Sequence, residues 1–426
     1  MEEALGIEVF LTDIPGIGGK LKGEPEDFVV DEIPIDMKTS EDGRYVVARI
    51  RTRNWETNRL IRMLARTLGI SRKRIRFAGT KDKRAITTQY IQFDCPPELV
   101  SSLRLRDVEV QETYRTEKRM ELGDLLGNRF DIRITAITIP TVEVTRQAVE
   151  IADCIKSLGG FPNFFGVQRF GATRPITHII GKKICEGDFE GAVFSYLTSP
   201  SKTESEEAQE ARRTLLSTRD FDEALKMFPK RLSFERAILN RLVKTPDDYP
   251  GAIEALPLNL QMMFVHAHQS YLFNMVLGER IRRGLPLNEP VDGDVIIPAK
   301  ENGLPDRKKV IEVSPENIEK ASRRVREGKA FVSGMILGTE SVFAKGPVGE
   351  IETSIAAREN ATPDDFLIPR IPRISSKGSR REILAPLKDF RFSVEPGSVK
   401  FAFQLIPGSY ATSLLREFMK ADLMNY

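Results

Sequence analysis

One acidic residue, Asp82, stands among cations in the segment FAGTKDKRAITTQ, and this setting favours catalysis. Lys81 precedes it, two further cations follow it, and the segment ends in two threonines and a glutamine. Positive neighbours and hydrogen-bond donors keep a carboxylate ionised, as a nucleophile or a general base requires. A surface salt bridge in a basic loop is the alternative interpretation of an isolated aspartate, so the surrounding sequence has to decide between the two.

Positive charge is concentrated around this loop. Between Arg44 and Arg84 the sequence has fourteen lysines and arginines and two acids, a net charge of +12, whereas the whole chain carries +3. A surface that neutralises phosphates needs such a concentration, because each contact releases condensed counterions. The window therefore favours nucleic-acid binding over scattered solvated charge. We expect RNA contacts from Arg62, Arg66, Lys73 and Arg74.

Short strands and one amphipathic helix are predicted to position these residues. Alternating side chains indicate strands near 28–31 and 45–50, another that ends at Phe93, and a fourth in NRFDIRIT from Asn128. Between them, apolar residues at helical spacing predict a helix with Thr57 as its N-cap and Gly69 as its stop. Strands and helices mix without a regular βαβ rhythm, which predicts an α+β fold class.

Changes in composition predict two domains. At 426 residues the chain exceeds the size of one hydrophobic core. A Gly-, Pro- and Phe-rich connection follows Leu158, and a Pro-, Ser- and Arg-rich stretch covers 360–386. The region between them contains a polar, helix-prone segment at 199–219 and a predicted helix at 264–283. Beyond it, two short strands, a turn and a helix are expected.

Several function classes are disfavoured. The N-terminal PGIGGKLKG lacks the spacing of a Walker A loop and of G-x-G-x-x-G, so we expect no nucleotide cofactor. The three cysteines show no C-x-x-C spacing and the three histidines no ligand pattern, so we expect no metal. No apolar run approaches the roughly 20 residues of a membrane span, and the start does not resemble a signal peptide. We expect a cytoplasmic protein without a membrane partner.

Five motifs together carry a family resemblance. The segment FAGTKDKRAITTQ resembles the signature of the TruD family of tRNA pseudouridine synthases, and LKGEPEDFVV, GNRF, PNFFGVQRFG and LIPGSYATSLLRE match in the same order. They extend from Lys22 to Glu417, and the sequence looks more like the archaeal or eukaryotic members than the compact bacterial ones. The resemblance implies a pseudouridine synthase catalytic domain with a mixed or antiparallel sheet and helices, built from 1–160 and 385–426. An inserted α+β TruD domain would occupy 161–384.

The resemblance also implies roles for individual residues. Asp82 would be the catalytic nucleophile, and Lys22, Asn128 and Phe130 match active-site positions. Lys22 could orient the carboxylate of Asp82, although alone it would be an ordinary solvated side chain. Phe130 cannot move a proton and would stack on the base, although the alternation pattern alone makes it a core residue.

Further residues are expected to hold the substrate. Lys81 and Arg169 are expected to bind it, with Arg169 contacting a phosphate. A satisfied arginine in a rigid hinge is the alternative for that residue. Arg380 and Arg381 form another basic spot that we expect to meet the RNA backbone.

The implied function is isomerisation of a uridine in tRNA to pseudouridine, without cofactor or metal and with tRNA as the partner of a monomeric enzyme. Uridine 13 of the dihydrouridine arm is the expected target, and other RNAs, including uridine 35 of certain tRNAs, stay open. Two alternatives also stay open at this point. One is a non-catalytic RNA-binding protein, and the other is a nucleobase hydrolase or glycosylase that uses Asp82.

Overall fold

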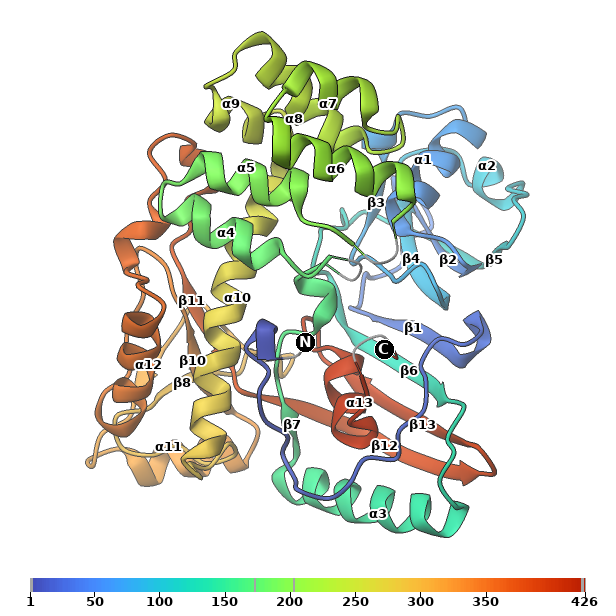
Figure 1. Cartoon of the computed structure of the whole chain (residues 1–426). Helices are drawn as coiled ribbons and strands as arrows, with labels where there is room; N and C mark the ends of the chain where they lie inside the picture. Colours follow the sequence, from blue (N-terminus) through green and yellow to red (C-terminus); the bar gives the residue numbers. More distant parts are fainter. Residues whose placement is uncertain (1–2, 172–173, 202–203, 423–424, 426) are drawn as a thin grey trace. The chain divides into compact units, whose positions relative to one another are not determined.

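The computed structural model describes residues 3–171, 174–201, 204–422 and 425 (Figure 1). The chain forms two compact units. The aspartate unit comprises Phe10–Phe161 and Ala385–Tyr426, and the middle unit comprises Met1–Val9 and Pro162–Leu384. The first nine residues therefore group with the middle unit, whereas the sequence prediction placed them with 10–160. That the two units are a catalytic and an inserted domain stays a prediction.

A mixed sheet is the framework of the aspartate unit. Its order is β5-β2-β4-β1-β6-β13-β12-β7, and β3 pairs with β4 beside this path. The pairing of β1 with β4 is parallel and that of β1 with β6 antiparallel. The strands are β1 (Phe28–Pro34), β2 (Tyr45–Arg53), β3 (Ile75–Phe77), β4 (Ile86–Phe93), β5 (Val108–Thr116), β6 (Leu125–Ile134), β7 (Gly160–Pro162), β12 (Leu384–Glu395) and β13 (Ser398–Leu405).

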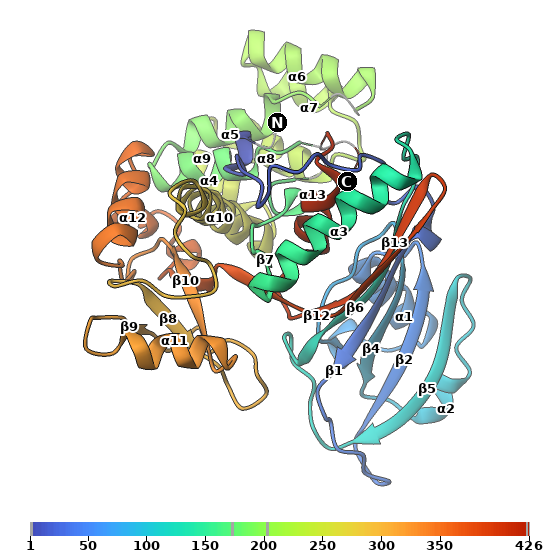
Figure 2. The ribbon, with the colours of Figure 1, turned by 90° about the horizontal axis from the view of Figure 1, so that it is seen from below.

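Helices of the aspartate unit pack on the face of the sheet that the alternation pattern predicted to be apolar. Phe130, Ile132 and Ile134 of β6 point into one core cluster together with residues of α3 and α13. Figure 2 shows α3 running across the sheet in this unit. The helices in the described part of this unit are α1 (Thr57–Thr67), α2 (Pro97–Ser101), α3 (Thr141–Leu158) and α13 (Ala411–Met419).

The helix α1 confirms one predicted boundary and corrects the other. It ends two residues before Gly69, which has a φ of 63°. Its N-cap is Glu56 and not Thr57, because the Glu56 carboxylate accepts hydrogen bonds from the backbone N–H groups of Asn58 and Arg59. A cap needs an oxygen that reaches these N–H groups, and the longer side chain one residue earlier provides it.

The middle unit combines helices with a small antiparallel sheet in the order β11-β10-β8-β9. Figure 1 shows α10 running between a group of helices and this sheet. The strands are β8 (Val295–Pro298), β9 (Ile311–Glu312), β10 (Ala330–Ile336) and β11 (Ser379–Glu382). The helices are α4 (Thr177–Cys185), α5 (Phe189–Thr198), α6 (Glu206–Thr218), α7 (Phe221–Met227), α8 (Ser233–Lys244), α9 (Tyr249–Glu254), α10 (Leu258–Arg282), α11 (Ile318–Arg326) and α12 (Gly346–Arg358).

The long helix α10 organises the middle unit. It begins six residues before the predicted start at 264 and ends before Gly284, which has a φ of 65°. Asn274 on this helix bonds the backbone N–H and C=O of Phe165, at 2.8 and 3.1 Å. The helix thereby fixes the PNFFGVQRFG segment. Short 3₁₀ turns complete both units at Glu3–Leu5, Pro25–Asp27, Arg72–Arg74, Val167–Arg169, Pro363–Phe366 and Pro372–Ile374.

Candidate active site

Asp82 and Lys22, which are 60 residues apart in sequence, meet in the aspartate unit. The Nζ of Lys22 lies 2.7 Å from the Oδ2 of Asp82, and the Asp82 side chain is 44% exposed while that of Lys22 is 14% exposed. Lys22 adopts a φ of 55°, in the left-handed region that side chains other than glycine rarely occupy. Such strain persists only where the surroundings hold it, and it concentrates at functional sites. The pair therefore combines an accessible carboxylate with a constrained cation.

An aromatic cluster lies beside this pair. The Nζ of Lys22 is 4.5 Å from the centroid of the Phe28 ring, and Phe28 meets Phe130 edge to face at 6.3 Å. Phe403 stacks on Phe130 with centroids 5.3 Å apart, because the register of β6 and β13 sets the two residues opposite each other. One face of the Phe130 ring is thus occupied by the core, as the alternation pattern predicted. Phe130 is 8% exposed, and whether it contacts a base stays a prediction.

The glycine of the GNRF motif explains why these strands can pack so closely. A Cβ at Gly127 would lie 2.3 Å from the backbone oxygen of Leu405 on β13. No side chain fits at that distance, so only glycine allows β13 to approach β6 here. The following residues, Asn128 and Phe130, are thereby placed beside β13.

Three buried carboxamide atoms lack hydrogen-bond partners among the residues that the structure describes. The Oδ1 of Asn128 and the Nε2 of Gln89 lie on strands that pair with β1, and the Oε1 of Gln147 lies on α3. Buried polar atoms are rarely left unpaired, so each one is a candidate for binding a polar ligand. Asn128 was predicted as a site residue, whereas Gln89 was considered only as a donor to the aspartate. Knowledge of the strand pairing would have pointed to Gln89, because β4, which carries it, and β6, which carries Asn128, both pair with β1.

Lys81, which was predicted to bind the substrate, is engaged inside the aspartate unit, and substrate binding by it stays a prediction. Its Nζ lies 2.5 Å from the Oε2 of Glu32, and both side chains are almost completely buried. The other oxygen of Glu32 accepts a hydrogen bond from the backbone N–H of Tyr90, and the N–H of Lys81 donates to the Thr57 hydroxyl. The ammonium group is used internally, so Lys81 ties the loop of Asp82 to the sheet. Sequence reasoning missed Glu32, although it alternates in phase with Phe28.

The predicted RNA-contacting cations of the aspartate unit are exposed. Arg62 and Arg66 lie on the solvent-exposed side of α1, and Lys73 and Arg74 lie on the turn that follows it. Arg74 comes within 4.0 Å of Asp94, and the other three have no carboxylate within that distance among the described residues. The four cations are therefore available to an anionic partner, and their contact with RNA stays a prediction.

Two cations predicted to meet the RNA backbone lie largely inside the middle unit. Arg380 is 2% exposed and forms an ion pair with the buried Glu352, with nitrogen and oxygen 2.8 Å apart. Arg381 is buried too, and its Nη2 donates to the Asn163 side chain at 2.7 Å. Both residues lie on β11, which pairs with β10 in the small sheet. The burial of Arg380 argues against its contact with RNA, whereas Arg381 also lines a pocket of this unit.

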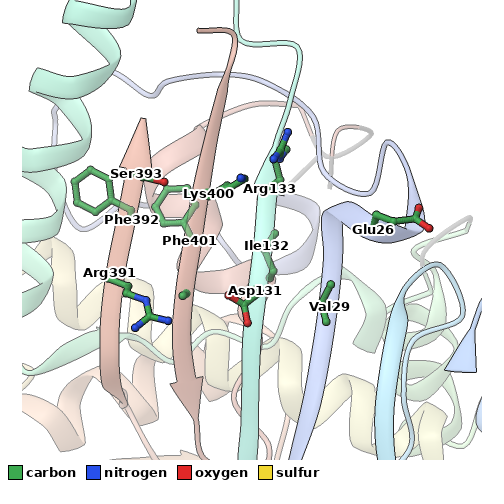
Figure 3. Close-up of a pocket in the computed structure, with 11 residues that line it drawn as sticks. Glu26, Val29, Asp131, Ile132, Arg133, Arg391, Phe392, Ser393, Lys400 and Phe401 are labelled. Carbon is green, nitrogen blue, oxygen red and sulfur yellow. The ribbon is translucent and has the colours of Figure 1, made fainter. Parts of the chain in front are cut away.

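A hollow of the aspartate unit lies on the other face of the large sheet. Its volume is about 320 Å³, and it contains none of the predicted site residues. Figure 3 shows Asp131 and Arg391 directed toward each other at one side, with Glu26 on a separate turn. Lys400 and Arg133 add positive charge. The hollow thus mixes both signs of charge over exposed strand positions.

The three histidines all belong to the middle unit, whereas Asp82 belongs to the aspartate unit. Burial lowers the pKa of His178 to about 4 and that of His268 to about 3. Burial, followed by the charge of Arg169, lowers the pKa of His266. In the described part of the chain, no three His, Cys, Asp or Glu residues are grouped so as to hold a metal ion. No helix in that part is long and apolar enough to cross a membrane.

Comparisons with known proteins place this geometry in a family. The family model described as tRNA pseudouridine synthase D (TruD) matches residues 4–418. A protein named probable tRNA pseudouridine synthase D from Methanosarcina acetivorans is 44% identical, over 99% of this chain and 97% of its own. A protein of the same name from Thermococcus onnurineus is 39% identical, over 96% of this chain and 97% of its own.

A solved structure agrees with these matches. The crystal structure of the putative tRNA pseudouridine synthase D from Methanosarcina mazei has a TM-score of 0.86 and 41% sequence identity, and the match covers 100% of this chain and 98% of that one. The α+β fold class is thereby confirmed, and the class of protein is that of the pseudouridine synthases. The chain belongs to the TruD family of tRNA pseudouridine synthases.

Proposed function

We propose that this protein converts uridine 13 of tRNA to pseudouridine, with Asp82 as its nucleophile and without a cofactor. The observation that carries the proposal is the pair of Asp82 and Lys22, in which an exposed carboxylate lies 2.7 Å from a constrained ammonium group. A nearby cation fixes the direction of a carboxylate through a charge-assisted hydrogen bond. Family membership supplies the reaction class, and this loop is the part of the chain equipped to perform it.

The reaction begins with the target uridine turned out of the RNA stack, at a cost of a few kcal/mol that RNA contacts must offset. The glycosidic bond then breaks, the detached uracil rotates, and its C5 forms a carbon–carbon bond to the sugar. Asp82 either attacks the anomeric carbon and forms a glycosyl ester or removes a sugar proton and forms a glycal. Both routes need an ionised, accessible carboxylate, and Lys22 would hold it in place without donating a proton.

Two neighbouring groups would hold the base. The unpaired Oδ1 of Asn128 is an acceptor for the N3–H of uracil, whereas the same position of cytosine is itself an acceptor. Phe130 has little surface to offer, because it is 8% exposed and Phe403 stacks on its ring. Recognition of the base is therefore assigned first to Asn128 and only secondarily to stacking on Phe130.

The test is Asp82→Asn compared with wild type on an unmodified tRNA transcript. Pseudouridine is detected by chemical labelling, because the isomerisation does not change mass. The variant should form no detectable product while its affinity for the transcript stays within about twofold, since an uncharged isostere removes the nucleophile alone. Asp94→Asn is the matched control, because it removes the same charge from an ion pair of the same unit, and it should retain activity.

The alternatives give different outcomes in the same assay. Wild-type protein that binds the transcript without forming pseudouridine would be an RNA-binding protein, and release of free uracil would identify a glycosylase. A transcript with cytidine at position 13 checks the position. If that transcript still acquires pseudouridine, the enzyme is a pseudouridine synthase and the assignment of uridine 13 is wrong.

A further inference from the structure

A pocket formed entirely by the middle unit collects three arginines. Its volume is about 280 Å³, and its lining includes Arg169, Arg307 and Arg381 together with hydroxyl and amide side chains. The described residues that line it include no aspartate or glutamate. A concave site with convergent cations and donors, and without carboxylates on its wall, is suited to an anion.

Arg169 is the arginine whose charge is least offset in this pocket. Its Nε donates to the Ser270 hydroxyl at 3.0 Å, and Ser270 in turn donates to the backbone oxygen of His266 at 2.7 Å. Among the described residues, no carboxylate lies within the 4.0 Å of an ion pair with Arg169. Because the internal bond uses Nε, the two terminal nitrogens can form the planar fork with which arginine binds phosphate.

The other two arginines set the charge and the shape of the pocket. The guanidinium of Arg381 lies 4.1 Å from the centroid of the Phe165 ring, and that of Arg169 lies 5.5 Å from the same centroid. Two like charges gathered around one ring repel each other, and a bound anion would relieve this repulsion. Arg307 is different, because it forms two contacts with the buried carboxylate of Glu382, at 3.0 and 2.5 Å. Arg307 therefore forms one wall of the pocket, and Glu382 neutralises its charge.

A tight glycine turn completes the rim. Gly378 has a φ of 78°, and a Cβ there would lie 2.5 Å from the Ser341 hydroxyl and 2.6 Å from the Ile336 backbone oxygen. The turn therefore requires glycine, and it leads directly to the exposed hydroxyl of Ser379 at the pocket. A hydroxyl beside an arginine is a common combination for contacting phosphate oxygens.

We propose that this pocket binds a phosphate group of the RNA strand, with Arg169 as the principal ligand and Ser379 at the rim. The inference rests on the proposed function, because it takes the substrate to be tRNA, and it adds a second point of contact on the middle unit. A phosphodiester and free inorganic phosphate share the chemistry that the pocket recognises. The RNA strand is the proposed source, and the experiment separates it from the free ion.

The first arm measures the equilibrium binding of a tRNA transcript to full-length protein over a series of salt concentrations. Arg169→Gln should weaken binding about tenfold and reduce the slope of log K against log salt by roughly 1, because one phosphate contact is lost. Arg213→Gln is the matched control, since Arg213 is an exposed arginine of the same unit paired with Glu210 on α6. Its slope should equal that of wild type, and an unchanged slope for Arg169→Gln would overturn the proposal.

The second arm identifies the source of the phosphate. Neutral methylphosphonate linkages are placed one at a time along a synthetic dihydrouridine arm. One linkage should weaken binding to wild type and leave binding to Arg169→Gln unaffected. Inorganic phosphate should compete with the RNA for wild type only. If phosphate binds at the pocket without competing and no linkage is sensitive, the site takes a free anion and the assignment to the RNA strand is wrong.

One variant and a stability measurement separate binding from folding. Arg169→Lys keeps a cation without the fork, and its salt slope should fall between those of wild type and Arg169→Gln. The melting temperature of Arg169→Gln should stay close to that of Arg213→Gln. If Arg169→Gln lost its cooperative melting transition and Arg169→Lys bound no better than it, the effect would be structural and the pocket proposal would fail. Absence of pseudouridine with wild type would instead count against the proposed function.

Discussion

The two units use arginine in opposite ways. In the aspartate unit, cations such as Arg62 and Arg66 lie on the surface of α1 without a carboxylate partner in the described residues. In the middle unit, four arginines are at most 4% exposed, whereas the described part of the aspartate unit buries one, Arg416. The buried four are Arg212, Arg280, Arg380 and Arg381. One residue type thus serves two purposes, an open electrostatic surface in one unit and an internal framework in the other.

The difference shows what a basic stretch in a sequence can and cannot indicate. The window of 44–84 carries a net charge of +12 with only two acids, too many cations to be neutralised locally, so most of them must face water or a ligand. The segment 370–382 around Arg380 and Arg381 has five cations and one acid, a comparable local excess over a much shorter length, and Arg380 is nevertheless paired with the distant, buried Glu352. The number of uncompensated cations over a long window, and not their local density, is therefore the informative quantity.

The largest expected effect is on the stability of the middle unit. Replacing Arg380 with Met leaves the fully buried carboxylate of Glu352 without its cation, and such a loss costs about 3–5 kcal/mol. Urea unfolding of the full-length protein should show the transition of the middle unit at much lower denaturant. The double variant Arg380→Met with Glu352→Gln should recover much of that loss. Arg213→Met should change stability by less than about 0.5 kcal/mol. A small effect of Arg380→Met alone would mean that the pair is not buried.

The second expected effect concerns the loop that carries Asp82. Lys81→Met removes the partner of the buried Glu32 and should cost about 3 kcal/mol. It should also lower kcat while changing KM little, because the loop no longer holds the nucleophile in place. Lys83 is exposed and of the same charge, so Lys83→Met is the control and should leave stability nearly unchanged. A KM effect without a kcat effect would return Lys81 to a substrate-binding role.

Much of the aspartate unit could be predicted from its sequence, because its elements are specified locally. Alternation located β1, β2 and β6, and helical spacing located α1 with an error of one residue at its N-cap. The position of Asp82 followed from its motif. In each case the information lies within about ten neighbouring residues, so periodicity and turn chemistry were sufficient.

The errors arose where a side chain's direction depends on strand register or on a distant partner. Lys81 turns inward because Glu32, 49 residues earlier, has a carboxylate that requires a cation. Asn128 lies opposite Glu32 through the pairing of β6 with β1, and Gln89 lies on β4, which also pairs with β1; no local pattern encodes either pairing. Arg380 is buried because β11 joins a sheet whose other strands lie far away in sequence. Long-range pairing and burial are decided by the whole fold, so a local reading of charge failed at these positions.

A third expected effect is a dependence of stability on pH that is confined to the middle unit. The pKa of His178 is lowered from 6.5 to about 4 by burial, so the unfolded chain binds a proton between these values while the folded chain does not. Stability is therefore complete above pH 6.5 and falls as the pH drops toward 4, by up to about 3 kcal/mol for this group. His268 adds to the same trend. His178→Phe should flatten the profile measured by urea unfolding between pH 7 and 5. An unchanged profile would show that His178 is not the titrating group.

The smallest expected effect is on tRNA binding by the exposed cations of the aspartate unit, each of which acts independently. Single changes of Arg62, Arg66 or Lys73 to Gln should each weaken tRNA binding by about 1 kcal/mol or less and reduce the salt slope by roughly 0.9. None should move the melting temperature, because exposed unpaired charges contribute little to folding. Combining the three should add their effects on binding, since solvated charges on one surface act nearly independently. If a single change instead destabilised the fold as Arg380→Met is expected to do, that cation would belong to an internal framework, and the contrast between the units would disappear.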